Sequence, residues 1–228
     1  VILGEYERSE NMNSLGALFG VHFSDGVLAH PNKLGSPVVL CASYTDEAVE
    51  KHSAFNRMQA WGYGVSVPTA VALDYSQVKD FEVYPVLVTG DSAWIEHETK
   101  DMVDGEFVCN PAAGEEEGNY AVLINLSRKI GDKEQRIIIS GDSDFITNEE
   151  FGLTRPGMEV NNFEVITGSF RWLSYDAYPI YTDRIGAIDN GINLSGDWRV
   201  WIKLFFMILF PAFLVGTGVM IIYRRQRK

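Results

Sequence analysis

Residues 120–145 read YAVLINLSRKIGDKEQRIIISGDSDF and contain the strongest strand signal in the chain. Two apolar runs, Tyr120–Ser127 and Arg136–Ser140, have the composition of buried strands. The residues between them include Gly131-Asp132, a pair typical of tight turns. The sequence therefore predicts a β-hairpin.

The second of these strands leads directly into small polar residues, Gly141-Asp142-Ser143-Asp144, and then to Asn148. Open α/β folds bind ligands at the carboxyl edge of the sheet, where a buried strand gives way to such a loop. We therefore predict a binding site that contains Asp142, Ser143, Asp144 and Asn148.

Three interpretations of this loop are open. A serine hydrolase would use Ser143 as the nucleophile and would need a histidine base, but all four histidines precede Ser143 and none lies in a downstream Asp-x-x-His pattern. A metal on Asp142 and Asp144 would need further ligands to complete its shell. The favoured interpretation is a strand-to-helix turn in which the three side chains accept backbone hydrogen bonds and cap the helix after the turn. We thus predict no catalytic residue, no metal and no cofactor.

The remaining folded part alternates between strand-like and helix-like patterns, which is typical of α/β proteins. Apolar spacing predicts helices at Glu10–Phe19, Thr45–Trp61 and Asn161–Leu173, the last capped by Asn161 or Asn162, and strands at Val1–Leu3, Pro37–Leu40, Val65–Leu73 and Phe81–Thr89, the last two of them interior. We expect a mixed, mostly parallel sheet flanked by helices. His52 is expected to be a packed side chain, since no second ligand stands at metal spacing.

Residues 91–118 form an acidic, glycine-containing segment that includes Glu96 and Glu115. Its oxygen ligands do not keep the spacing of a calcium loop, so we interpret it as a solvated loop. Cys41 and Cys109 are the two cysteines. One disulfide and two free, buried thiols are both compatible with the sequence.

The chain ends in Leu204–Tyr223, LFFMILFPAFLVGTGVMIIY, followed by RRQRK. Twenty uncharged residues in a helix span the roughly 30 Å hydrocarbon layer of a bilayer. Trp198, Trp201 and Tyr223 stand at its edges, as aromatic residues do at membrane interfaces, and the basic end is expected to stay cytoplasmic. A buried core helix is the alternative. We predict an extracytoplasmic domain at residues 1–195 and a transmembrane helix with a cytoplasmic tail at 196–228.

The net charge of residues 1–199 limits the kinds of partner that they can bind. The chain has 19 Lys and Arg against 31 Asp and Glu. Residues 200–228 hold five of the cations and none of the acids, which leaves the remainder at a net charge of −17. Nucleic acid and anionic lipid headgroups both require a basic surface and are therefore not expected partners.

The chain begins with Val1-Ile2-Leu3, without an initiator Met or a signal peptide. A domain that crosses a membrane needs such a signal upstream. We therefore expect the C-terminal part of a longer chain or a processed form.

Several short stretches resemble the auxiliary component of gliding-motility-type (GldG-like) ABC transport systems. They are RIIISGDSDFITN at 136–148, the segment from Asn161-Asn-Phe to Trp172-Leu173, the terminal helix with Pro211 and its basic end, the N-terminal residues 3–21, and YPVLVT at 84–89 followed by Ala93-Trp94. The resemblance implies an extracytoplasmic α/β domain of flavodoxin-like or glutamine-amidotransferase-like architecture, held beside an ABC permease whose ATPase is cytoplasmic. It transfers no catalytic residue to this chain.

Two functions follow as hypotheses. The first is a membrane-anchored, non-catalytic accessory subunit in the cell inner membrane, with a periplasmic domain that binds the permease and ATPase assembly, either as one copy or as a homo-oligomer. The second is an extracytoplasmic hydrolase or amidotransferase-like enzyme that uses the Gly141–Phe145 loop. A catalytic thiol at Cys41 is not expected, because Val39-Leu40-Cys41-Ala42-Ser43 lacks the glycines of a nucleophile elbow.

Overall fold

The computed structural model describes residues 1–31, 36–97, 107–153, 155, 157–178 and 196–227. The chain separates into two compact units, Val1–Tyr181 and Thr182–Lys228. The first contains the sheet and the candidate site, and the second contains the terminal helix.

The central element of the first unit is the predicted hairpin. Strand β9 (Ala121–Ile130) pairs antiparallel with β10 (Lys133–Ser140), in a register that runs from Ile130 opposite Lys133 to Leu123 opposite Ser140. Gly131 and Asp132 form the two-residue turn, and Gly131 has a φ of +61°. Glycine adopts this left-handed conformation without steric cost. The hairpin prediction is confirmed.

Six strands form the main sheet, in the order β1-β10-β9-β7-β4-β5. The further strands are β1 (Ile2–Leu3), β7 (Glu82–Val88), β4 (Val39–Tyr44) and β5 (Val65–Pro68). Among the described strand pairs of this sheet, β1 with β10 is parallel and the others are antiparallel. The prediction of a mostly parallel sheet was wrong. The interior position expected for Phe81–Thr89 is confirmed by β7, whereas β5 lies at an edge.

A break in one predicted helix lies between the antiparallel strands β4 and β5. The segment Thr45–Trp61 is two helices, α2 (Asp46–Lys51) and α3 (Ser53–Ala60), separated by His52, whose φ is −144°. One helix of that length would extend about 25 Å and carry the chain to the opposite end of the sheet, which is the path to a parallel strand. Two short helices return the chain to the end at which β4 finishes, so β5 runs antiparallel to β4.

His52 is a packed side chain, as predicted. It is 7% exposed, and its ring centroid lies 5.3 Å from that of Phe55. Burial lowers the pKa of its imidazole, which favours the neutral ring.

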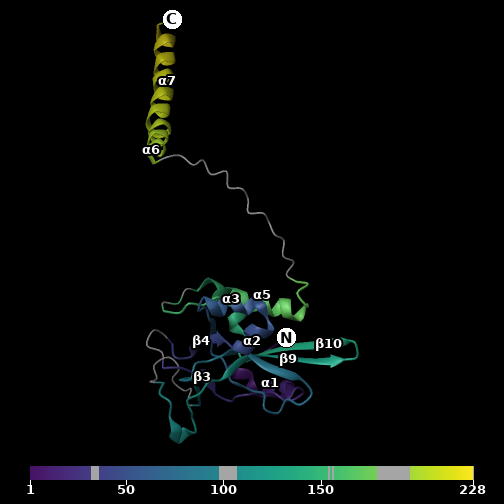
Figure 1. Ribbon diagram of the computed structural model, residues 1–228. Helices are drawn as coiled ribbons and strands as arrows, with labels where there is room; N and C mark the ends of the chain where they lie inside the picture. Colours follow the sequence, from purple (N-terminus) through teal and green to yellow (C-terminus); the bar gives the residue numbers. More distant parts are fainter. Residues whose placement is uncertain (32–35, 98–106, 154, 156, 179–195, 228) are drawn as a thin grey trace. The chain divides into compact units, whose positions relative to one another are not determined.

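Helices cover both faces of the sheet (Figure 1). On one face α2, α3 and α5 (Asn162–Leu173) pack over a core that includes Ile138. On the other, α1 (Ser9–Gly16) lies with a two-stranded sheet of β2 (His22–Phe23) and β6 (Leu73–Asp74), over a core that includes Ile137 and Ile139. Consecutive residues of β10 thus serve opposite cores, as the two-residue period of a strand requires.

The acidic segment is more ordered than a solvated loop, and that interpretation was wrong for its described part. Strand β8 (Trp94–Glu96) pairs with β3 (Val27–Ala29). Glu96 is 5% exposed and accepts a hydrogen bond from the Trp94 indole (3.2 Å). Glu115 is 2% exposed and accepts the backbone N–H groups of Asn110 (2.6 Å) and His97 (3.3 Å). Residues 98–106 of this segment lie outside the described residues.

Both cysteines are free thiols. Cys41 is exposed and Cys109 is partly exposed. The free state was one of the two alternatives, but neither side chain is buried as that alternative supposed.

The second unit is a helix in three parts: α6 (Gly196–Leu204), the π-helical turn η5 (Phe205–Leu209) and α7 (Phe210–Gln226). Val200–Gln226 is long and apolar enough to cross a membrane, with a mean hydropathy of 2.4, and no part of that apolar window is buried against protein. Pro211 has no N–H to donate to the carbonyl four residues earlier. The Phe210 N–H reaches back five residues to the Phe205 carbonyl, so the wider turn ends just ahead of the proline.

Two glycines of the first unit should respond differently to substitution. Gly131→Ala forces a positive φ on alanine and should lower the free energy of unfolding by about 1 kcal/mol. Gly141→Ala should cost more than about 3 kcal/mol, because the new Cβ would lie 2.0 Å from the Val71 carbonyl oxygen. Urea denaturation of the full chain in detergent, followed by circular dichroism, measures both. Equal costs would contradict the close packing at Gly141.

Candidate functional site

Two parallel strands end side by side and bring distant polar residues together. The Gly4 N–H that follows β1 donates to the Ser140 carbonyl at the end of β10 (2.7 Å). Glu5 therefore lies beside the Asp142–Asp144 loop, although it is 138 positions from Ser143 in the sequence. The carboxyl-edge location predicted for Asp142, Ser143 and Asp144 is present here, formed by the single parallel pair described.

Asp142 is a buried acid with one free oxygen. Its side chain is 1% exposed, and its Oδ1 accepts the Asp144 N–H (2.8 Å). Its Oδ2 has no hydrogen-bond partner among the described residues. Burial raises the pKa of Asp142 to about 8, the negative charges of Asp144 and Glu5 add to this, and the backbone N–H groups of Asp144 and Phe145 oppose it. A proton on this carboxyl group is therefore favoured near neutral pH.

Glu5 acts on Ser143 and Asp144 in different ways. The Ser143 hydroxyl donates to the Glu5 carboxylate (2.5 Å). Burial, and then the charges of Glu5 and Glu150, raise the pKa of Asp144. The site therefore gathers like charges, yet within the described residues no group of three His, Cys, Asp or Glu side chains is arranged to hold a metal ion.

Asn148 is not part of this group. It is the exposed first residue of α4 (Asn148–Gly152), which follows the short helix η4 (Asp144–Ile146). The cap of α4 is Thr147, whose Oγ1 accepts the Glu150 N–H (3.3 Å). The turn interpretation thus holds for Asp142, while the capping role falls to a residue that the sequence analysis did not single out.

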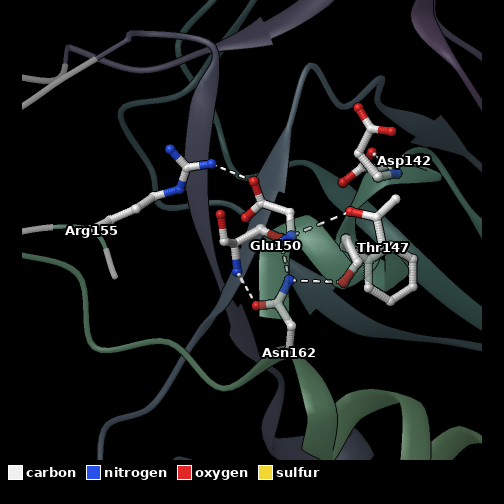
Figure 2. Close-up of polar contacts among 8 residues, drawn as sticks. Asp142, Thr147, Glu150, Arg155 and Asn162 are labelled. Atoms are coloured by element: carbon white, nitrogen blue, oxygen red, sulfur yellow. Dashed lines mark hydrogen bonds and ion pairs between the residues drawn. The ribbon is translucent and has the colours of Figure 1, made fainter. Parts of the chain in front are cut away.

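Asn162 holds the loop from below (Figure 2). It is 5% exposed, accepts the Ser66 N–H (2.9 Å) and donates to the carbonyls of Ser66 (2.8 Å) and Phe145 (2.9 Å). Its neighbour Asn161 is the actual cap of α5, through the Glu164 N–H (3.3 Å). Asn161 thus caps α5, whereas Asn162 connects α5 to Ser66 and Phe145. The sequence indicated only the capping role.

An ion pair with one buried partner is drawn in the same view (Figure 2). The Arg155 guanidinium binds the Glu150 carboxylate, and Glu150 is 8% exposed. Glu150 Oε2 and Arg155 Nε have no hydrogen-bond partner in the described part of the chain. Removing Arg155 would leave the buried Glu150 charge without its counter-ion.

An apolar pocket of about 200 Å³ opens under the loop. Its lining includes Leu3 of β1, Leu123 of β9, Ile138 of β10, Phe145 and Ile146 of η4, and Ile166 and Phe170 of α5. The loop that begins with buried Asp142 therefore presents an aromatic ring to an apolar space. No local pattern predicts this pocket, because its walls come from five separate segments.

The described histidines do not complete a hydrolase site at Ser143. A serine and a histidine do meet elsewhere: His30 Nε2 lies 3.0 Å from Ser92 Oγ. Within the described residues no carboxylate is hydrogen-bonded to the His30 ring, and the partner of Ser143 is Glu5. Neither serine therefore has the nucleophile, base and orienting acid of a triad.

No protein-family model and no curated protein matches this chain.

Asn162→Ala should destabilise the first unit more than Asn161→Ala does. The first substitution removes three buried hydrogen bonds and leaves backbone groups of Ser66 and Phe145 unpaired, at a cost of roughly 3 kcal/mol. The second removes one helix cap, at about 1 kcal/mol. Thermal unfolding of the two variants beside the parent chain measures the difference, and an equal loss would show that Asn162 does not hold the loop.

Asp142→Asn should remove a pH dependence of stability. The pKa of Asp142 is about 8 in the folded chain and about 4 when unfolded, so the folded state retains a proton that the unfolded state has lost. Stability should fall as pH rises from 4 to 8, by about 1.4 kcal/mol for each unit of pKa difference. Asparagine keeps the oxygen acceptor without ionising. Urea denaturation at pH 5 and pH 8 measures the free energy of unfolding of both proteins. The parent should lose stability between these pH values relative to the variant, and an equal change in the two proteins would refute the raised pKa.

Proposed function

We propose that this chain is a membrane-anchored, non-catalytic accessory subunit of an ABC transport system. The observation that carries the proposal is the unburied apolar helix Val200–Gln226, joined in one chain to a folded α/β unit. The resemblance to GldG-like components supports the assignment to ABC transport. The folded unit then acts as a binding or assembly domain.

Charge supports an orientation for this subunit. Arg224, Arg225, Arg227 and Lys228 follow the apolar helix and favour the cytoplasmic side, since positive residues are retained there during insertion. In a bacterial inner membrane the folded unit then faces the periplasm. Its acidic balance favours protein partners, namely the permease and ATPase assembly, over nucleic acid.

The candidate site supports binding rather than bond breaking. Asp142 is buried, and the adjacent space is an apolar pocket. A pocket of this type provides complementarity to an apolar group and no transition-state charge stabilisation.

One contact favours a second candidate function, an extracytoplasmic hydrolase or amidotransferase-like enzyme. The Glu5 carboxylate accepts the Ser143 hydroxyl hydrogen, which is the geometry of a base beside a nucleophile. In that mechanism the Ser143 oxygen attacks the carbonyl carbon of an ester or amide while Glu5 takes its proton. Glu5 passes that proton to the alcohol or amine that leaves as the C–O or C–N bond breaks, and water then hydrolyses the acyl-serine. The raised pKa values of Asp142 and Asp144 would suit neighbouring proton donors.

Cross-linking in native membranes tests the accessory-subunit proposal. A photo-reactive residue in the folded unit should recover a polytopic permease at native expression, and recovery of the chain alone would contradict the proposal. Protease added to spheroplasts should digest the folded unit, and its protection would place that unit in the cytoplasm.

The variants Ser143→Ala and Asp144→Ala separate the two candidate functions. An accessory subunit should keep its cross-link in both variants. Loss of ester or amide turnover with assembly intact would favour the enzyme.

A further inference from the structure

Helix α5 has two apolar faces, and only one is packed on the sheet. Val165 and Trp172 face the core and are 0% and 7% exposed. Phe163 and Phe170, seven residues apart and therefore on one side of the helix, are 60% and 58% exposed. Aromatic rings of this size are normally buried when no partner is present.

Residues of neighbouring segments extend this surface. Phe151 of α4 packs edge to face against Phe163, with centroids 6.3 Å apart. Ile146, Ile166 and Phe170 line the mouth of the apolar pocket together. We call this set, Ile146, Phe151, Phe163, Ile166 and Phe170, the outer face of α5.

Two exposed tyrosines follow α5 in the sequence. Tyr175 is 55% exposed, with its ring against the Arg136 guanidinium and its hydroxyl donating to the Glu134 carbonyl (2.7 Å), and Tyr178 is 61% exposed. Tyrosine is enriched where apolar and aqueous phases meet, because its ring is apolar and its hydroxyl is polar.

The sequence limits the distance between this surface and the anchor. Tyr178 is followed by the 17 residues 179–195 and then by Gly196, the first residue of α6. Seventeen residues reach at most about 60 Å when fully extended. When the helix is anchored in a bilayer, the connecting residues are short enough to keep α5 near that bilayer. The effective concentration of lipid at the surface of α5 is therefore high.

We propose that the outer face of α5 docks on the surface of the bilayer, at the boundary between headgroups and acyl chains. This inference rests on the proposed membrane anchoring. The lipid it fits is neutral, because the folded unit is acidic and the nearby Arg155 and Arg171 are paired with Glu150 and Asp176. Burial of the exposed aromatic side chains in the interface supplies the attraction.

Depth-dependent quenching tests the docking in the full chain. Cys41 and Cys109 are replaced by Ser, and one new cysteine, Phe163→Cys or Phe170→Cys, carries an environment-sensitive fluorophore. The exposed Lys79, which follows Val78 of the core on the opposite face of the sheet, provides the matched control as Lys79→Cys. The chain is reconstituted at high dilution in phosphatidylcholine vesicles with or without spin-labelled acyl chains.

Both outer-face positions should show blue-shifted emission and at least about twofold more quenching than position 79. Quenching equal to that at position 79 in anchored chain would overturn the docking while leaving the anchor in place. A blue shift that grows with the ratio of protein to lipid, without quenching, would assign the face to a second copy and overturn the proposal. A blue shift seen only in native membranes would assign it to a protein partner and overturn it too. Failure of the chain to float with vesicles would instead refute the membrane anchoring itself.

Discussion

The hydrogen bond from the Gly4 N–H to the Ser140 carbonyl joins the first strand of the chain to the end of its strongest hairpin. The candidate site depends on this parallel pairing, because it sets Glu5 beside Asp142, Ser143 and Asp144. The pairing requires glycine at position 4: a Cβ there would lie 2.7 Å from the ring of Phe23 and 2.9 Å from the Ser140 carbonyl oxygen. Strand β1, only two residues long, thus places Glu5 beside the loop and contributes Leu3 to the wall of the apolar pocket.

Carboxyl groups buried in this acidic unit are accommodated in four ways. Glu115 accepts backbone N–H groups, Glu96 accepts an indole N–H, and Glu150 pairs with Arg155. Asp142 has only partial hydrogen bonding within the described residues, and its raised pKa favours a proton in place of a partner. Desolvation is costly for any carboxylate, and burial raises the pKa of Asp142 to about 8.

Local patterns in the sequence predicted the local elements well. The hairpin, the helix at Asn161–Leu173 and the apolar terminal helix each depend on turn residues, caps or periodicity within a short window. Strand direction was not predictable in this way, since it depends on pairing between distant segments and, for β4 and β5, on a break at His52 that apolar spacing does not reveal. The partnership of Ser143 with Glu5 joins residues far apart in sequence. Glu96 and Glu115 were taken as surface charges because composition cannot show which carboxylates meet buried donors.

The π-helical turn at Phe205–Leu209 changes what the terminal helix offers to its surroundings. An α-helix advances about 100° per residue, so one additional residue in a turn rotates every later side chain by about that angle. A stripe of side chains that begins at Trp201 is therefore not continuous with the one beyond Phe210. The two halves of the helix therefore present their side chains in different directions. Partner helices that pack on the first half would approach from a different side than those that pack on the second.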